Sequence, residues 1–153
     1  MSMRYFVCVF CLILLLSTPA MAVAEGEAAR VKTFKGTAFI VRQQQAIQVK
    51  QHDRIYPGDL LRTGPDGTMG VIFRDNTTLS LGPRSEIAVD EFLFAPSQGK
   101  LSIVTRMFRG TAAYLSGVIA KLSPASVRFE TPAATIGIRG THFLVQVEGA
   151  DKK

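Results

Sequence analysis

Residues 69–81 read MGVIFRDNTTLSL, and this stretch decides the fold class. Val71 and Phe73 in its first half, and Leu79 and Leu81 in its second, are each separated by one other residue. Successive side chains of a strand point to opposite faces of a sheet, so apolar residues at every second position predict half-buried strands. The stretch therefore predicts two strands that cover one side of an apolar core.

Two short polar segments predict the turns that join such strands. Asp75-Asn76-Thr77 stands between the two runs, and Asn adopts the left-handed conformation that a tight hairpin needs. Upstream, Gly64-Pro65-Asp66-Gly67 combines Pro, which fixes φ, with Gly, which adopts positive φ at little cost. Both segments predict tight turns between neighbouring strands.

Similar short runs, separated by Gly, Pro, Asn and Asp, occupy most of the chain. We expect strands at residues 36–42, 46–50, 59–62, 69–74, 77–81, 86–94, 100–108, 111–115, 126–131, 135–139 and 141–148. Many short strands at regular spacing are typical of an all-β domain. The predicted fold is one all-β domain of short, mostly antiparallel strands, arranged as a sandwich, a barrel or a short coil of strands.

Two segments depart from this pattern. Apolar residues at helical spacing, ended by Pro124, indicate one short helix near residues 114–122. Apolar residues then occupy even positions before Gly140, as at Ile138, and odd positions after it, as at Phe143. A change of parity at a Gly predicts a bulge or sharp bend there, with Arg139 pointing outward and paired with a carboxylate or with carbonyls.

The first 24 residues have the three parts of a secretory signal peptide. Arg4 is followed by an uncharged apolar stretch at 5–16, and small residues then allow cleavage after Ala22 or Ala24. The domain organisation predicted is a cleavable signal peptide at 1–24, a polar lead-in at 25–35, the all-β domain at 36–148 and a tail at 149–153. We expect a periplasmic or secreted protein whose mature chain has no transmembrane span, because no later apolar run is long enough.

The residue types needed for most catalytic and metal sites are scarce. Cys8 and Cys11 would be removed with the signal peptide, so no thiol remains. His52 and His142 are far apart in the sequence, and no pair of carboxylates is placed for acid–base chemistry. The sequence predicts a protein that is not an enzyme, with no cofactor and no metal. A hydrolase with an unrecognised carboxylate pair is a less favoured alternative.

The chain is basic, with 18 Lys and Arg against 12 Asp and Glu. The basic residues are spread over many predicted strands, without consecutive runs and without interleaved aromatic residues, which does not favour nucleic-acid binding. They are Arg42, Lys50, Arg62, Arg74, Arg106, Arg109, Arg128 and Arg139. Weak attraction to an anionic envelope glycan is compatible with this charge.

Four segments in order resemble the FecR domain family: GDLLRTG at 58–64, VIFRDNTTLSL at 71–81, SEIAV at 85–89 and TPAATIGIRGTHFLV at 131–145. The family usually has Gly where this chain has Asn76. The resemblance assigns structural motif positions to Gly58, Asp59, Thr63, Gly64, Asp75, Asn76, Thr131, Pro132, Arg139, Gly140 and Thr141.

The resemblance implies an extracytoplasmic, all-β, non-catalytic module. Archetypal members are membrane-anchored sigma regulators with a cytoplasmic tail, a transmembrane helix and a further C-terminal lobe. We expect none of these parts here, so the sigma-regulator mechanism is not carried over.

The function predicted is binding to a protein partner in an envelope signalling or surface system, and the alternative is a peptidoglycan- or polysaccharide-binding accessory protein. Arg139 and His142 are the candidate partner surface, together with the turns at 64–67 and 75–77.

Overall fold

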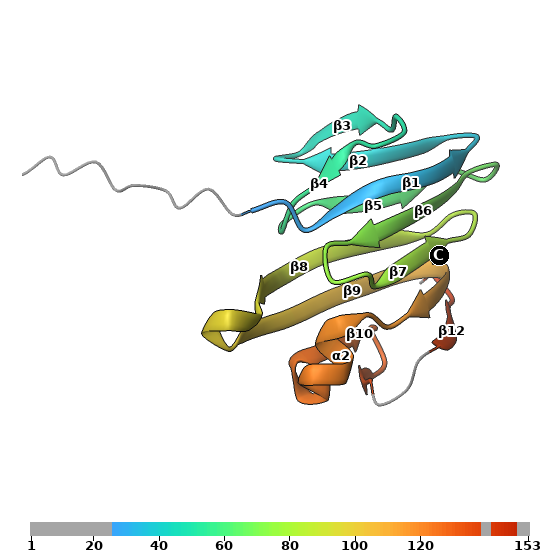
Figure 1. Cartoon of the computed structure of the whole chain (residues 1–153). Coiled ribbons are helices and arrows are strands. Elements are labelled where there is room, and N and C mark those ends of the chain that lie inside the picture. The colour runs from blue at the N-terminus through green and yellow to red at the C-terminus, as the bar shows by residue number, and fades with distance from the viewer. Residues whose placement is uncertain (1–25, 139–141, 150–153) are drawn as a thin grey trace, which may run out of the picture.

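The structure is a computed structural model, and it describes residues 26–138 and 142–149. The described residues form a 12-stranded sheet that curls so that its two halves face each other (Figure 1). Half A contains, in spatial order, β4 (Arg54–Ile55), β1 (Ala29–Lys35), β6 (Thr68–Phe73), β7 (Thr78–Leu81), the C-terminal part of β9 (Lys100–Leu115) and β12 (His142–Val147).

Half B contains β3 (Gln45–Gln48), β2 (Ala38–Arg42), β5 (Leu60–Thr63), β8 (Glu86–Ala95), the N-terminal part of β9, β10 (Val127–Glu130) and β11 (Thr135–Gly137). Three short helices complete the fold: η1 (Pro96–Gln98), α2 (Val118–Leu122) and η2 (Pro124–Ser126). In Figure 1 the chain progresses from β3 and β2 at one end to α2 and β12 at the other. The all-β prediction is confirmed, and the architecture is a coil of strands flattened into two facing halves.

The core lies between the two halves. Phe73 of β6 meets Phe92 of β8 with 5.6 Å between ring centroids, and Tyr114 of β9 meets Phe129 of β10 at 5.9 Å. The inward positions of β6 and β7 are the alternating residues of the 69–81 stretch, and all of them are buried. Because every second residue along a strand is buried in both halves, the apolar pattern of the sequence predicted the individual strands.

Strand β9 belongs to both halves, which the sequence did not predict. The prediction of separate strands at 100–108 and 111–115 is wrong. The backbone instead continues through Gly110, at φ 95°, as one bent strand. Its first part pairs with β8 and β10, and its last part pairs with β7 and β12, so β9 joins half B to half A.

The predicted boundaries also differ from the structure in the polar lead-in and in the helix. The expected polar lead-in at 25–35 contains β1, whose Ala29 and Val31 are buried although the residues around them are charged. The expected helix near 114–122 is shorter, because residues up to Leu115 remain in β9. β10 and β9 form a parallel pair in a sheet whose other described pairs are antiparallel, as expected for most of them. No helix in the described residues is long and apolar enough to cross a membrane.

Candidate functional site

Asp59 holds together the start of β5 and the end of β2. Its carboxylate forms two bonds with Arg42, Nε to Oδ1 at 2.8 Å and Nη2 to Oδ2 at 2.7 Å, and accepts the backbone N–H of Tyr56 at 2.8 Å. The bond to Asp59 raises the pKa of Arg42, and the guanidinium lies 4.7 Å from the centroid of the Tyr56 ring. Asp59 is buried, so this motif residue acts as a structural clamp. The neighbouring Gly58 is exposed at the turn.

The turn at 64–67 joins β5 to β6, as predicted. Gly67 N–H donates to the Gly64 carbonyl at 3.0 Å, and Gly64 N–H donates to the Thr37 carbonyl at 2.8 Å. A hydrogen bond with the Thr37 side chain holds the pKa of the exposed Asp66 carboxyl below its ordinary value. These hydrogen bonds, within the turn and to Thr37, give the segment a structural role.

Thr63 fixes the loop between β7 and β8. Its hydroxyl donates to the Gly82 carbonyl at 2.7 Å and accepts the N–H of Ser85 at 2.9 Å. The hydroxyl of Ser85 donates to the carbonyl of Thr111 at 2.9 Å and accepts its N–H at 3.0 Å. Thr63 and Ser85 therefore tie β5 and this loop to β9.

Asp75 connects the β6–β7 hairpin to the start of α2. Its carboxylate accepts the N–H of Thr77 at 3.0 Å, the hydroxyl of Thr77 at 2.9 Å and the N–H of Ile119 at 3.2 Å. Its backbone carbonyl accepts the N–H of Val118 at 2.7 Å. Asn76 has φ 66°, so the predicted left-handed turn is confirmed. The sequence predicted the turn, but the contact with α2 was missed because these residues are far apart along the chain.

The closing segment of the motif is only partly described. The hydroxyl of Thr131 donates to the carbonyl of Ala134 at 3.0 Å and accepts its N–H at 3.1 Å, which closes the β10–β11 turn around Pro132. Arg139, Gly140 and Thr141, and with them the predicted bend, lie outside the described residues. His142 is exposed on β12, opposite Leu115 of β9.

The motif residues that the structure describes thus share one role, the fixing of turns and strand junctions. They are spread over both halves of the sheet and do not converge on a common cavity. In the described part of the chain, no group of three or more His, Cys, Asp and Glu side chains could hold a metal ion.

Charged side chains gather on the outer face of half B. Glu86 of β8 binds Arg62 at 2.8 Å and Arg109 at 3.1 Å, and Arg106 of β9 binds Asp90 at 2.9 Å and Glu130 at 3.2 Å. Many of the basic residues spread along the sequence are therefore paired with carboxylates. These pairs neutralise three arginines of this face, Arg62, Arg106 and Arg109.

The outer face of half A is different across β6, β7, the end of β9 and β12. The outward residues of these four strands include no Asp, Glu, Lys or Arg, and they are Thr68, Gly70, Ile72, Thr78, Ser80, Thr111, Ala113, Leu115, His142, Leu144 and Gln146. We call this surface the uncharged face. The sequence analysis did not predict this face. The feature that could have indicated it is the small residues at outward positions of three strands.

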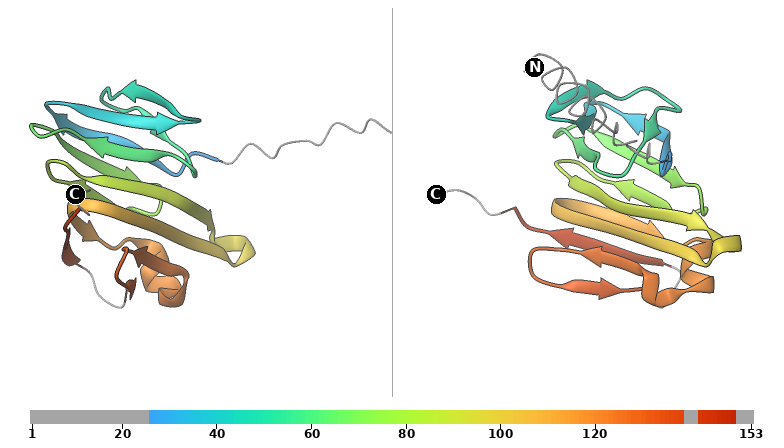
Figure 2. Two further views of the ribbon diagram at one scale, coloured as in Figure 1. Left: turned by 180° about the vertical axis from the view of Figure 1, so that it is seen from behind. Right: turned by 90° about the vertical axis from the view of Figure 1, so that its left-hand side faces the viewer.

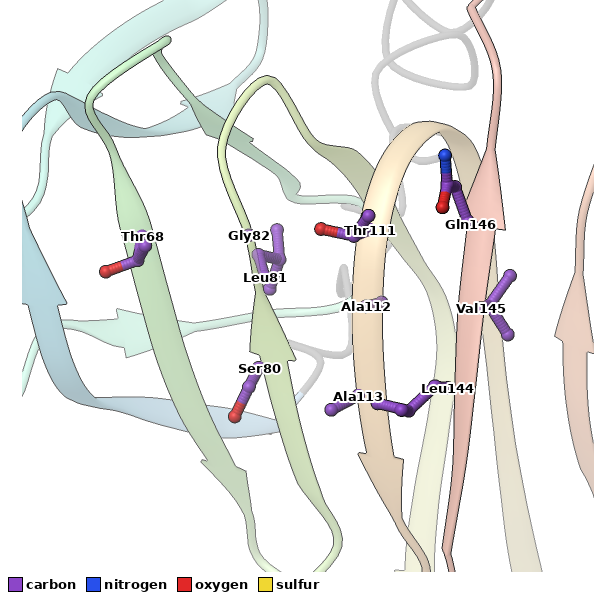
Figure 3. Close-up of a pocket in the computed structure, with 10 residues that line it drawn as sticks. All are labelled: Thr68, Ser80, Leu81, Gly82, Thr111, Ala112, Ala113, Leu144, Val145 and Gln146. Atoms are coloured by element: carbon purple, nitrogen blue, oxygen red, sulfur yellow. The ribbon is translucent and has the colours of Figure 1, made fainter.

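A hollow of about 560 Å³ lies in the uncharged face (Figure 3). Its floor is made by small residues such as Gly82, Ala112 and Ala113. The side chain of Leu144 reaches toward Ala113 from β12, and this leucine is 75% exposed, the most exposed of the large apolar residues described. The hollow contains hydroxyl and amide groups at Ser80, Thr111 and Gln146, but no carboxylate and no basic group.

A family model described as "FecR protein" matches residues 59–153. The chain belongs to the FecR family. No curated protein and no solved structure matches the chain. The resemblance of the four sequence segments to this family is confirmed, and the FecR family is in general one of non-enzymatic signalling regulators. The match begins at Asp59, so β1 to β4 precede it, although Val31 and Ile55 from these strands lie in the same core as the FecR region.

Proposed function

We propose that this FecR-family chain is an exported, non-catalytic module that binds a protein partner in a cell-envelope signalling system. The uncharged face carries this proposal. Isolated surface leucines are ordinary, but Leu144 stands beside an apolar hollow, on a face without formal charge, in a protein whose opposite face is lined with ion pairs. The cores of protein interfaces are depleted in charged residues in the same way.

A protein partner suits this hollow better than an anionic glycan does. Glycan phosphates and carboxylates need basic groups, and the hollow contains none. Its small floor residues leave room for an apolar side chain of a partner, while Ser80 and Gln146 supply hydrogen-bonding groups beside it. The hollow therefore favours a protein partner over an anionic glycan.

Site-specific photo-crosslinking tests this function. A photo-reactive residue at Leu144 of the full chain, expressed in its own host, should give a discrete crosslinked protein in the envelope fraction. Ser80→Lys, which places a charge in the hollow, should abolish that product. Ser97→Lys makes the same chemical change in η1, far from the hollow, and should leave the product intact.

Two results would contradict the proposal. One is an absence of any crosslink from Leu144 while the protein is folded and exported. The other is pelleting of the purified protein with peptidoglycan, unaffected by Ser80→Lys, which would favour the glycan alternative.

A further inference from the structure

The two halves of the sheet end unevenly beyond β9. Half B continues with two strands, β10 and then β11, whereas half A continues with β12 alone. Figure 2 shows these three strands together at the end of the molecule opposite β3. Phe129 of β10 and Phe143 of β12 face each other, with 5.5 Å between ring centroids, so β12 covers β10. In the described residues, half A has no strand to cover β11.

β12 is the longest edge strand in the described part of the sheet. It has six residues, compared with four in β3, three in β11 and two in β4. Its pairing with β9 is uninterrupted from His142↔Leu115 to Val147↔Gly110. Proteins usually protect edge strands with charge, Pro, a bulge or short length, and the segment His142–Val147 has none of these.

A second hollow opens beside this edge, between β12 and the β10–β11 turn. We call it the notch; it has a volume of about 310 Å³, its apolar lining is Pro132, Ala133, Ile136, Val145 and Val147, and Thr131, Gln146 and Glu148 complete it. Val145 and Val147 point inward on β12 but are only half-buried. The inward residues of β7 in the same half, Leu79 and Leu81, are fully covered. The notch therefore exposes apolar surface that one more strand would bury.

From these observations we infer that β12 accepts an extended segment of the partner protein as a further strand of half A. The segment would hydrogen-bond to the free edge of β12 and place alternate apolar side chains in the notch. Main-chain bonds supply affinity in such strand addition, and side-chain pockets supply selectivity. This inference rests on the proposed function and names the mode of binding.

The unequal halves favour a single extended segment over a second copy of this chain. Antiparallel pairing of two β12 edges would place the β10–β11 hairpins of both copies on the same side of the joined sheet. The overhanging β11 of each copy would then compete for space with β10 of the other. A lone strand meets no such obstacle and completes the cover of β11.

A defined peptide tests this inference on the processed protein purified from the envelope. The probe is an eight-residue peptide in which Val alternates with Thr, with Lys at each end. The control peptide has the same composition with its Val residues consecutive. Amide hydrogen exchange should slow in β12 with the probe but not with the control peptide, and the uncharged edge strand β3 should be unaffected.

Ala133→Lys places a long charged side chain at the notch from the β10–β11 turn without changing any residue of β12, and it should weaken probe binding by about tenfold or more. Ala125→Lys introduces the same charge at an exposed position of η2 and should leave binding unchanged. Absence of protection in β12, equal protection of β3, or insensitivity to Ala133→Lys would overturn the inference.

The same variants separate failure of this inference from failure of the proposed function. If the crosslink from Leu144 forms and is lost in Ser80→Lys, but the probe never protects β12, the protein binds its partner through the uncharged face without strand addition. If neither the crosslink nor the protection is seen, the proposed function itself fails. A change of the purified protein to a dimer that protects β12 would identify a second copy as the occupant and would overturn the argument from the overhang.

Discussion

Buried polar residues of the FecR motif stabilise junctions between elements. Asp75 is the clearest case, since its buried carboxylate accepts three hydrogen bonds from the hairpin and from α2. Removing one partner from a buried network lowers the free energy of unfolding by more than the net contribution of its hydrogen bonds. The remaining donors stay buried, where neither the partner nor water can accept their hydrogen bonds. Motif residues of this kind are explained by folding without any role in binding.

Asp75→Ala should lower the free energy of unfolding by about 3 kcal/mol, because three donors would remain buried without an acceptor. Urea denaturation measures the change. Asp90→Ala removes a partly exposed ion pair with Arg106 and should cost less than about 1 kcal/mol. Similar losses in the two variants would contradict the junction role of Asp75.

Tyr114 presents the opposite situation, a buried polar group without a bond. Thr77 lies close enough to act on the pKa of the phenol, but its hydroxyl is already bonded to Asp75 and to the N–H of Gly117. In the described structure the Tyr114 hydroxyl has no hydrogen-bond partner within bonding geometry. Burial is the largest effect on this group, and it raises the pKa of Tyr114 well above its ordinary value.

Tyr114→Phe should change stability at neutral pH by less than about 1 kcal/mol, because no hydrogen bond is lost. Above the ordinary tyrosine pKa of about 10, the unfolded chain releases the phenolic proton whereas the folded chain retains it. Wild-type stability should therefore fall as pH rises beyond that value, and the fall should be smaller in Tyr114→Phe.

Denaturation midpoints across alkaline pH measure this difference. Tyr56→Phe, which leaves Tyr114 in place, is the matched control. A large loss of stability in Tyr114→Phe at neutral pH would show that the hydroxyl makes a bond that matters.

At the scale of elements, β9 determines how the two halves face each other. The strand bends at Gly110, and a Cβ at that position would lie 2.3 Å from Ser85 Oγ and 2.4 Å from Ser85 Cα. The bend thus combines positive φ with close approach to a neighbouring backbone. The Ser85 hydroxyl, which bonds both backbone groups of Thr111, secures the strand immediately after the bend.

Gly110→Ala should reduce stability by at least about 3 kcal/mol, through backbone strain together with the clash against Ser85. Gly99→Ala is the matched control, because Gly99 also has a positive φ but open space where a Cβ would stand. It should cost only about 1–2 kcal/mol. Thermal unfolding of the two variants checks the difference, and equal midpoints would mean that the contact with Ser85 is easily relieved.

At the scale of the whole molecule, the ion pairs that join β5, β8, β9 and β10 lie on one half of the sheet and the hollow of the uncharged face lies on the other, although exposed apolar residues such as Phe108 also occur on half B. The ion pairs of Glu86 and Arg106 lie on half B, and the hollow beside Leu144 lies on half A. A protein with this distribution can remain soluble through one face and bind through the other.

Export is the prediction that belongs to this scale. The full chain should be recovered from the envelope without its first residues, beginning at Val23 or Glu25, because 1–24 has the parts of a cleavable signal peptide. Intact-mass measurement checks the new N-terminus. Leu14→Arg, which interrupts the apolar stretch, should prevent processing, and recovery of a membrane-bound product that retains Met1 would contradict the prediction.

The sequence by itself determined the features that depend on neighbouring residues. Period-two apolar spacing at 69–81 identified half-buried strands, and Asn76 identified a left-handed turn, because side-chain direction and φ preference are local properties. The resemblance to the FecR family also rested on short ordered segments and is confirmed by the family match. The sequence did not predict β1, because its inward residues Ala29 and Val31 are few and small and have charged neighbours.

Only the tertiary structure decided which surfaces the strands form together. Asp75 meets Ile119 across 44 residues, and Ser80, Ala113 and Leu144 become neighbours through pairing of β7, β9 and β12. The order and register of strands follow from burial of all inward faces at once, which no local pattern specifies. The hollow, the notch and the unequal ends of the two halves are consequences of that order, and for this reason they could not be read from the sequence.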